Sequence, residues 1–488
     1  MKKTREYITQ KSFFLCPDPS RILFKPFIPP NEGRITRIAA RILTLSEKTV
    51  QTELNSIGKE FLDSKLNVEK IFLDNFKKVK PYLPTDASLS IRKKTLIGAY
   101  FTHEYSFEST AVFNPSIVPH LDQTNLQNGQ LRFIMSLRSV GEGHISTISF
   151  RTGILDEENT ITIDPPKKFA YLAEQIPNAT YDKLLFSHKL YDLGLDNKFA
   201  TSCLNKLPDS FTFNNLIRVL KDILYATARI THTDRLTYDK MIWLAKSNYE
   251  TRFSPDVSLS ERVIFPVSPT EINGIEDARF VLFTEDDGTK IYYATYTAYD
   301  GRAIMPEILE TRDFLCFKMI TLNGQAAVNK GMALFPRKIQ GQYVMLSRQD
   351  NENISLMYSN NIHFWDEAST IIKPAYPWEF VQLGNCGAPI ETDAGWLVLT
   401  HGVGSVRKYS IGAVLLDKED PSTIIGRLAD PLFMPDESER SGYVPNVFYT
   451  CGSIINNGHL IIPYGITDSK IGFATLPLHK LLDDLQNN

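Results

Sequence analysis

The segment NGIEDARF, residues 273–280, places two carboxylates side by side and an arginine two residues after the second. Glu276 and Asp277 are of the types that donate or accept protons in catalysis. Arg279 would lower the pKa of a neighbouring carboxyl group, whereas the second carboxylate would raise it. An isolated motif of this kind is more often a salt-bridged turn than a catalytic site, so the elements around it must decide between the two interpretations.

Five segments share one form, which is an apolar, alternating strand that ends in polar or charged residues. They are LRFIMSLR ending at Arg138, IYYATYTAYD at Asp300, YVMLSRQD at Arg348, GWLVLTHG at His401 and HLIIPYGITD near Asp468. The last four ends recur at intervals of 48 to 67 residues, which suits a propeller blade of four short strands. The pattern predicts a mainly β fold, a β-propeller whose strand ends meet at one axis. A β-sandwich with added helices uses the same strands but gives no reason for their polar ends.

Two helical blocks interrupt the β pattern. Residues 1–95 are predicted to form an N-terminal helical extension, in which Ser46 and Asn67 each precede an apolar repeat of helical spacing and are expected to cap helices. The second block is an insert at about 155–250, where FTFNNLIRVLKDIL shows the same spacing. The predicted catalytic domain is therefore residues 96–488, with the helical insertion between early propeller strands. We expect the two additions to mediate homo-oligomerisation.

Composition limits the partners of the chain. Charged residues make up 22% of its 488 residues and the formal net charge is -3, so no basic field attracts nucleic acid or an anionic membrane. The sequence contains neither an apolar run of membrane-span length nor one of signal-peptide type, and we expect a cytoplasmic protein. The five cysteines are widely separated and are predicted to be reduced, structural thiols. No HExxH motif is present, and no metal or organic cofactor is predicted.

Several further segments of the chain, taken together with NGIEDARF and in their order along the sequence, carry a resemblance to a known family. They are AVFNPSIV, NKGMALFPRKIQGQYVMLSRQD, LGNCGAPIETDAGWLVLTHGV, GYVPNVFYTCG and IIPYGITD, between about residues 105 and 480. In these segments the sequence resembles glycoside hydrolase family 130, the β-mannoside phosphorylases and β-mannosidases built on a five-bladed β-propeller. The resemblance implies a glycoside phosphorylase that carries out inverting phosphorolysis of β-manno-oligosaccharides to mannose 1-phosphate, with inorganic phosphate as co-substrate.

The resemblance also implies roles for particular residues. Asp277 corresponds to the general acid, which in this family is thought to act through a sugar hydroxyl. The phosphate-binding positions fall on Lys330, Arg348, Gln382 and His401, and Gln382 can donate hydrogen bonds but brings no charge. The substrate-binding positions are Asn114, Arg138 and Asp468 for the mannosyl ring, Asp300 and Tyr409 beside it, and Glu276 and Arg279, which would hold the acid loop. Ala278 stands where many members have proline.

Two other functions use parts of the same pattern. An inverting β-mannosidase would attack with water and needs a second carboxylate as base, for which Glu276 and Asp350 are the candidates. None of the four phosphate positions carries Asp or Glu, which favours phosphorolysis. A carbohydrate-binding propeller without turnover needs neither an acid at Asp277 nor a basic cluster beyond the sugar.

Overall fold

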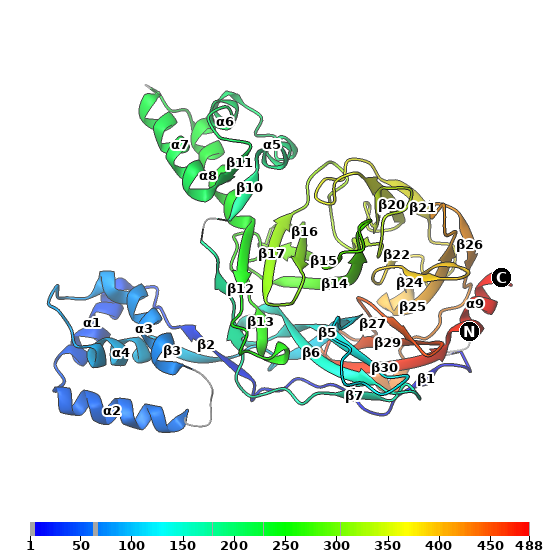
Figure 1. The fold of residues 1–488 in the computed structure, drawn as a ribbon, viewed down its shortest axis with the longest axis horizontal. Coiled ribbons are helices and arrows are strands. Elements are labelled where there is room, and N and C mark those ends of the chain that lie inside the picture. The colour runs from blue at the N-terminus through cyan, green and yellow to red at the C-terminus, as the bar shows by residue number, and fades with distance from the viewer. Residues whose placement is uncertain (1–4, 62–66, 178, 228, 303, 488) are drawn as a thin grey trace. The chain divides into compact units, whose positions relative to one another are not determined.

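A computed structural model describes residues 5–61, 67–177, 179–227, 229–302 and 304–487 (Figure 1). The chain divides into two compact units. Unit 1 consists of Met1–Pro17, Thr110–Pro166 and Leu172–Asn488, and unit 2 of Asp18–Ser109 and Lys167–Tyr171.

Unit 2 is a small helical unit with one pair of strands. Its helices are α1 (Glu32–Leu43), α2 (Glu47–Glu60), α3 (Val68–Val79) and α4 (Ile91–Tyr100), and its strands β2 (Ile22–Pro26) and β3 (Thr102–Ser106) pair antiparallel. Ser46 and Asn67 accept hydrogen bonds from backbone N–H groups of the first turns of α2 and α3, so both predicted caps are confirmed. Apolar side chains of α1, α3 and α4 form the core of the unit.

Within the described part of unit 1, five larger sheets follow one another along the chain. Sheet I contains β4 (Ala111–Pro119), β5 (Leu131–Val140), β6 (Ser146–Leu155), β7 (Ile161–Ile163) and β13 (Arg262–Ile264). Sheet II contains β14 (Ile275–Thr284), β15 (Lys290–Tyr299), β16 (Ile304–Thr311), β17 (Cys316–Thr321), β12 (Tyr249–Arg252) and β9 (Glu174–Gln175). Sheet III contains β18 (Ala333–Leu334), β19 (Tyr343–Ser347), β20 (Ile354–Ser359) and β21 (Ser369–Ile372).

The last two sheets have the same antiparallel form. Sheet IV contains β22 (Gln382–Asn385), β23 (Ile390–Thr392), β24 (Gly395–Val403), β25 (Tyr409–Leu416) and β26 (Ile424–Arg427). Sheet V contains β27 (Phe448–Tyr449), β28 (Ile454–Asn456), β29 (His459–Ile466), β30 (Lys470–Pro477) and the distant β1 (Thr9–Gln10). The fold is mainly β, as predicted.

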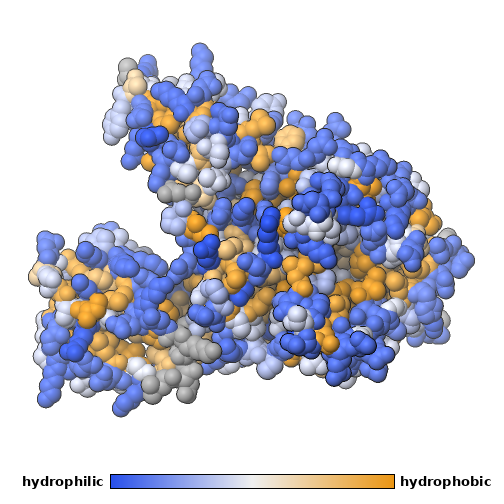
Figure 2. Space-filling view, viewed as in Figure 1, coloured by the Kyte–Doolittle hydropathy of each residue, from blue (hydrophilic) through white to orange (hydrophobic). Residues whose placement is uncertain are grey.

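The hydrophobic core of unit 1 lies between neighbouring sheets. Separate clusters of buried side chains join sheets I and II, II and III, III and IV, and IV and V. A further cluster joins sheet V back to sheet I, through residues such as Phe133 and Phe473. The sheets therefore contact one another in cyclic order. In the face shown in Figure 2, hydrophilic residues cover much of the outer edge of these sheets.

The helical insert separates β6 from β13, the third and fourth main strands of sheet I. It contains α5 (Lys183–Asp192), α6 (Lys198–Leu204), α7 (Phe213–Ala226) and α8 (His232–Ser247), with β10 (Thr180–Asp182) paired to β11 (Ser210–Thr212) and a core of its own. The helices begin at Lys183, later than the expected 155, because residues 155–182 include short strands, some of which join the sheets. The segment FTFNNLIRVLKDIL forms α7, as its spacing predicted.

Residues near the two ends of unit 1 meet on sheet V. Strand β1 pairs with β30, and the backbone N–H of Leu15 donates to the carbonyl of Ile471 at 2.9 Å. The hydroxyl of Tyr7 donates to Asp484 of α9 (Leu478–Gln486) at 2.7 Å. Figure 1 shows both ends beside this sheet.

The five cysteines, Cys16, Cys203, Cys316, Cys386 and Cys451, are all free thiols, as predicted. Across the described ranges, none of the helices has both the length and the apolar character needed to cross a membrane.

Candidate functional site

One cavity of about 210 Å³ collects most of the predicted site residues. Every one of the five sheets, or a loop attached to it, contributes to the wall. The lining consists of Asn114, Arg138, Asp277, Arg279, Lys330, Arg348, Gln382, His401, Arg407, Tyr409, Val444, Val447, Tyr449 and Asp468. Four of the five polar strand ends, at Arg138, Arg348, His401 and Asp468, therefore converge on a single site.

Asn114 and Asp277 reach the cavity from two matching β-bulges. The pairing of β4 with β5 shifts between Phe113 and Ser116, and that of β14 with β15 shifts between Glu276 and Arg279. Asn114 and Asp277 have φ of 48° and 54°, in the left-handed region that non-glycine residues rarely occupy. A bulge of this kind re-aims a side chain that the regular pleat would direct elsewhere.

The bulges bring Asp277 against an amide and a guanidinium. Asn114 Nδ2 donates to Asp277 Oδ1 at 2.5 Å, and Arg138 Nη1 donates to the same oxygen at 3.2 Å. The structure assigns both of these bonds to Oδ1. Because the Asp277 side chain lines the cavity and is 13% exposed, we expect Oδ2 to be the oxygen that is available to a ligand.

The two cavity carboxyl groups have opposite pKa shifts. Burial by itself raises the pKa of Asp277, but Arg138, Arg279 and Lys330 outweigh it and hold this pKa below its ordinary value. Burial raises the pKa of Asp468 to about 7, because Arg138 and Arg407 offset only part of the effect. In the free protein at neutral pH, Asp277 is therefore ionised, whereas the pKa of Asp468 lies in the neutral range.

Glu276 lies behind the cavity wall rather than in it. Its Oε1 accepts from Arg138 Nη2 at 2.7 Å, and its Oε2 is 3.9 Å from Lys330 Nζ. Glu276 thus ties together two cations that act on Asp277. The expected role of Glu276 in holding the acid loop stays a prediction.

Arg348, His401 and Gln382 form a connected group of hydrogen-bonding side chains. Arg348 Nη1 lies 3.0 Å and Gln382 Nε2 lies 3.3 Å from His401 Nε2. Since arginine can only donate, Nε2 accepts and carries no proton, so the imidazole is neutral with its hydrogen on Nδ1. Burial, reinforced by Arg348 and Arg279, lowers the pKa of His401 well below its ordinary value, which agrees with this assignment.

Arg279 is buried beneath the cavity and positions its wall. Its Nη2 donates to the hydroxyl of Tyr449 at 2.7 Å and its Nε donates to the carbonyl of Cys386 at 3.2 Å. The Tyr449 ring packs against His401, with ring centroids 4.8 Å apart, and Tyr409 stacks on the same imidazole at 6.0 Å. Arg279 therefore connects the Asp277 bulge to sheets IV and V.

Besides Glu276, two residues named from the sequence do not line the cavity. Asp300 Oδ1 accepts the backbone N–H of Arg302 at 2.8 Å and so closes the turn between β15 and β16. Asp350, the second candidate for a hydrolytic base, accepts the backbone N–H groups of Glu352 and Asn353, both at 2.9 Å. Both carboxylates are engaged by their own turns.

The cavity also contains residues that sequence reasoning missed, namely Arg407, Tyr449, Val444 and Val447. Tyr449 and the two valines belong to the quoted segment GYVPNVFYTCG, which therefore carried a usable signal. Arg407 follows the THGV segment by a few residues, and no motif pointed to it.

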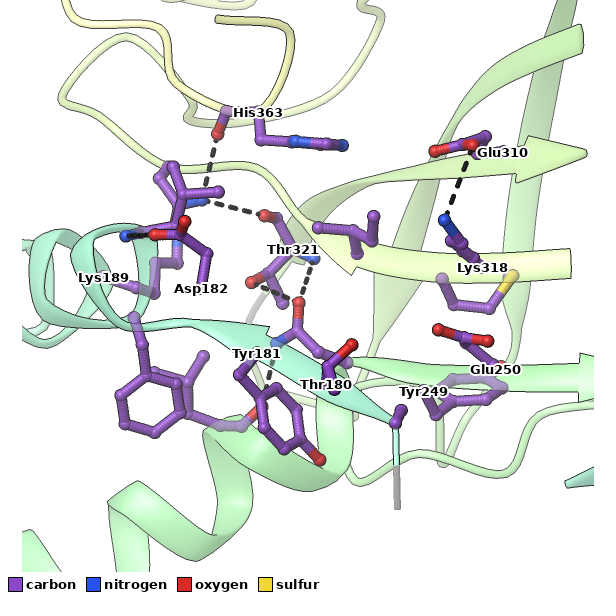
Figure 3. Close-up of a pocket in the computed structure, with 18 of the residues that line it drawn as sticks. Thr180, Tyr181, Asp182, Lys189, Tyr249, Glu250, Glu310, Lys318, Thr321 and His363 are labelled. Atoms are coloured by element: carbon purple, nitrogen blue, oxygen red, sulfur yellow. Dashed lines mark hydrogen bonds and ion pairs between the residues drawn. The ribbon is translucent and has the colours of Figure 1, made fainter. Parts of the chain in front are cut away.

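A second cavity of about 360 Å³ lies between the insert and sheet II, and contains none of the predicted site residues (Figure 3). Its polar groups largely satisfy one another. Lys189 Nζ donates to the carbonyl of Leu322 at 2.7 Å, Lys318 pairs with Glu310 at 3.7 Å, and Asn248 Oδ1 accepts from the backbone of Thr321 at 2.9 Å. These contacts anchor the insert on the sheet.

The sequence model of a family described as beta-1,4-mannooligosaccharide phosphorylase matches residues 206–487. The chain belongs to this family, glycoside hydrolase family 130. It is 34% identical over 230 residues to a 1,2-beta-oligomannan phosphorylase of Thermoanaerobacter sp. (strain X514), covering 45% of this chain and 74% of the relative.

Another relative is a beta-1,2-mannobiose phosphorylase of Listeria innocua, 26% identical over 278 residues, which are 54% of this chain and 74% of the relative. A solved complex of the Listeria innocua enzyme with beta-1,2-mannobiose matches 78% of this chain and 93% of its own, with 19% identity and a TM-score of 0.46.

Proposed function

We propose that the protein is an inverting β-mannoside phosphorylase that releases mannose 1-phosphate from manno-oligosaccharides. The observation that carries the proposal is the cavity itself, whose lining brings the Asp277 carboxyl together with Arg348, Lys330 and the donor groups around His401. Phosphate is an anionic nucleophile that needs a cationic cradle rather than a general base. Phosphorolysis is also the activity named for the relatives.

In this proposal Asp277 is the general acid, acting through a sugar hydroxyl. It must be protonated to act, and phosphate binding favours its protonated form. The pKa of Asp277 is low in the free protein because cations outweigh burial. A bound phosphate dianion places negative charge beside Lys330 and Arg348 and offsets their effect, which raises the pKa of Asp277. The acid would thus become protonated when the nucleophile is in place.

The remaining side chains hold the mannosyl ring and the nucleophile. Asn114, Arg138 and Asp468 offer donors and acceptors for vicinal hydroxyls. Gln382 donates to phosphate without charge, and Arg348 provides the buried positive charge of the cradle. Attack from the face opposite the leaving oxygen inverts the anomeric centre.

We further propose that sheets I to V are the blades of a five-bladed β-propeller, with the cavity on its axis. The cyclic order of the core clusters and the contribution of every sheet to one cavity support this arrangement. The N-terminal helical extension would then be unit 2, mainly Asp18–Ser109, in place of the expected 1–95, because β1 belongs to sheet V. The catalytic domain, expected at 96–488, would begin near Thr110 and include β1.

The test of the proposed function is product release from β-1,2- and β-1,4-linked manno-oligosaccharides with and without inorganic phosphate. We expect mannose 1-phosphate only when phosphate is present. Free mannose formed at the same rate without phosphate would instead indicate a hydrolase. Asp277→Asn should lower turnover by orders of magnitude and keep sugar binding, whereas Asp350→Asn, which changes a turn outside the cavity, should keep activity.

We also propose that the helical additions mediate self-association, and the strand pairing of unit 2 allows a clean test. Pro26 and Thr102 are partners at the end of the β2–β3 pair, so residues 27–101 can be replaced by an Asn-Gly hairpin turn that leaves both strands and β1 in place. Light scattering should then report fewer chains per particle. An unchanged oligomer would exclude these four helices as the contact.

A further inference from the structure

If the proposed function holds, the substrate has a second sugar, the acceptor, on the leaving-group side of the cleaved bond. The size of the cavity determines where this acceptor sugar lies. Its volume of about 210 Å³ is below the roughly 300–1,000 Å³ of pockets that enclose a drug-sized ligand. A mannosyl ring and phosphate already fill such a space. The acceptor sugar, on the other side of the scissile bond, therefore lies at the mouth.

One side of the mouth is built from two segments fixed against each other. The turn at residues 404–408 joins β24 to β25, and the segment at 443–447 precedes β27. The backbone N–H of Tyr409 donates to the carbonyl of Asn446 at 2.9 Å, and that of Val444 donates to Thr467 at 2.8 Å. The two segments thus stand directly beside the Asp468 turn.

Arg407 is the charged side chain that this turn presents to the cavity. The residue is exposed and lines the cavity, and within the described ranges its guanidinium has no hydrogen bond or ion pair. Its charge reaches Asp468, whose pKa it lowers against the larger effect of burial. Arg407 is thus a cation at the mouth that remains available to a ligand.

The backbone of the turn is strained in a way that holds Arg407 in place. Val406 and Arg407 have φ of 51° and 54°. The corresponding turn of sheet I, residues 141–145, has the same form, with Gly143 at 71° and His144 at 59°. Where that turn has glycine, this one has a β-branched residue, for which positive φ is a clear outlier. Backbone strain of this kind occurs preferentially at ligand sites.

An exposed aromatic residue, Tyr443, directly precedes Val444, which lines the cavity. Tyr443 is 50% exposed and stacks on His144, with ring centroids 6.0 Å apart and an interplanar angle of 24°. The backbone N–H of Tyr443 donates to Ser469 Oγ at 2.8 Å, which holds the backbone of this residue next to the Asp468 turn. A tyrosine offers both an apolar face and a hydroxyl, which suits a sugar ring.

We propose that Arg407 determines acceptor specificity by binding hydroxyl groups of the acceptor sugar, which packs against the Tyr443 ring. The acceptor is a hexose or a short manno-oligosaccharide, because a planar guanidinium can bridge two neighbouring oxygens. This inference rests on the proposed phosphorylase activity and adds the sugar on the leaving-group side of the bond.

The test uses the full-length protein in the synthetic direction, with mannose 1-phosphate as donor and mannose or mannobiose as acceptor. Arg407→Ala should raise the KM for the acceptor about tenfold or more, as expected for loss of about 1.4 kcal/mol. The KM for mannose 1-phosphate should stay within about twofold, since the donor occupies the inner cavity. Tyr443→Ala should act in the same direction. The matched control is Arg302→Ala, an exposed arginine in the turn between β15 and β16 that does not line the cavity.

Two results would overturn the inference. An unchanged acceptor KM in Arg407→Ala would remove Arg407 from the acceptor site, and a rise in the KM for mannose 1-phosphate alone would assign it to the donor. If the wild-type protein makes no product, the proposed function fails. The role of Arg407 in sugar binding can then still be tested by titration calorimetry. Arg407→Ala should then weaken binding of mannobiose but not of mannose, and equal weakening of both would contradict the inference.

Discussion

Arg138 links the acid of the cavity to both of its neighbouring carboxylates, so its replacement gives the sharpest prediction. Its guanidinium lies 3.2 Å from Asp277 Oδ1 and 2.7 Å from Glu276 Oε1, and it also lowers the pKa of Asp468. Arg138→Gln keeps a planar donor of smaller size and removes the charge. The pKa values of Asp277 and Asp468 should therefore both rise.

The magnitude follows from the distance. Two unit charges 3.2 Å apart interact by about 5 kcal/mol at an effective dielectric constant of about 20. The side chains are 20% and 13% exposed, so solvent screens part of this interaction. Carboxylates beside an arginine have pKa values lowered by about 1–3 units. We expect a rise of this size for Asp277 when the charge is removed.

The assay is the pH dependence of kcat/KM for the β-mannoside at saturating phosphate, so that the enzyme that binds the sugar already holds the nucleophile. A general acid must be protonated to work, so activity falls as the pH rises above its pKa, and a higher pKa moves this falling limb to higher pH. In Arg138→Gln the limb should move up by about 1–3 units while the maximal rate falls, because Arg138 also lines the substrate cavity. Arg302→Gln should leave the profile in place. A limb that stays fixed or moves to lower pH would refute the assignment of the acid to this group of charges.

Three further predictions test the cradle and the core. Gln382→Lys adds the missing charge beside His401 and should lower the KM for phosphate about fivefold, measured by phosphate titration, since charge-assisted hydrogen bonds exceed neutral ones by about 1 kcal/mol. Gly384→Ala places a methyl group 2.5 Å from His401 Cε1 and should raise that KM about tenfold, whereas Gly58→Ala, which meets open space, should not. Burial and Glu271 raise the pKa of Glu307 in the folded protein to about 8, from 4.5 in the unfolded chain. The protonated Glu307 therefore stabilises the fold fully below pH 4.5, and this contribution to the free energy of unfolding is lost as the pH rises to about 8. Glu307→Gln should reduce the fall in Tm over this range, each pKa unit being worth about 1.4 kcal/mol, and an equal fall in both proteins would contradict the shift.

The sequence predicted those features in which local pattern and tertiary structure agree. Ser46 and Asn67 cap helices because short polar side chains satisfy free N–H groups wherever a helix begins. The polar strand ends were visible because an alternating strand that stops in charged residues has no apolar partner there. The insert follows β6, which ends at Leu155, but its helices begin only at Lys183. The preceding short strands were not predicted, since strands of two or three residues such as β9 leave no periodicity.

The predicted and observed site residues differ where backbone conformation decides which way a side chain points. Asp300 follows β15 and Asp468 follows β29, and both look alike in sequence as polar ends of apolar strands. Asp300 folds back onto its own turn, whereas Asp468, with φ of 49°, reaches the cavity. Arg407 was missed because its position depends on a left-handed valine at 406, a conformation that the residue type argues against.

The strand β1 has a consequence for how the protein is made. It pairs with β30, which lies more than four hundred residues later in the chain, so this pairing cannot form until β30 has been synthesised. Because closing so long a loop is entropically costly, β1 should dock late, after the other strands of sheet V have assembled. Until then the outer edge of β30 presents unpaired backbone groups, which another chain can occupy. Amide exchange of Thr9 and Gln10 should accordingly be faster than that of the inner strands, and concentrated refolding should favour aggregation through this edge.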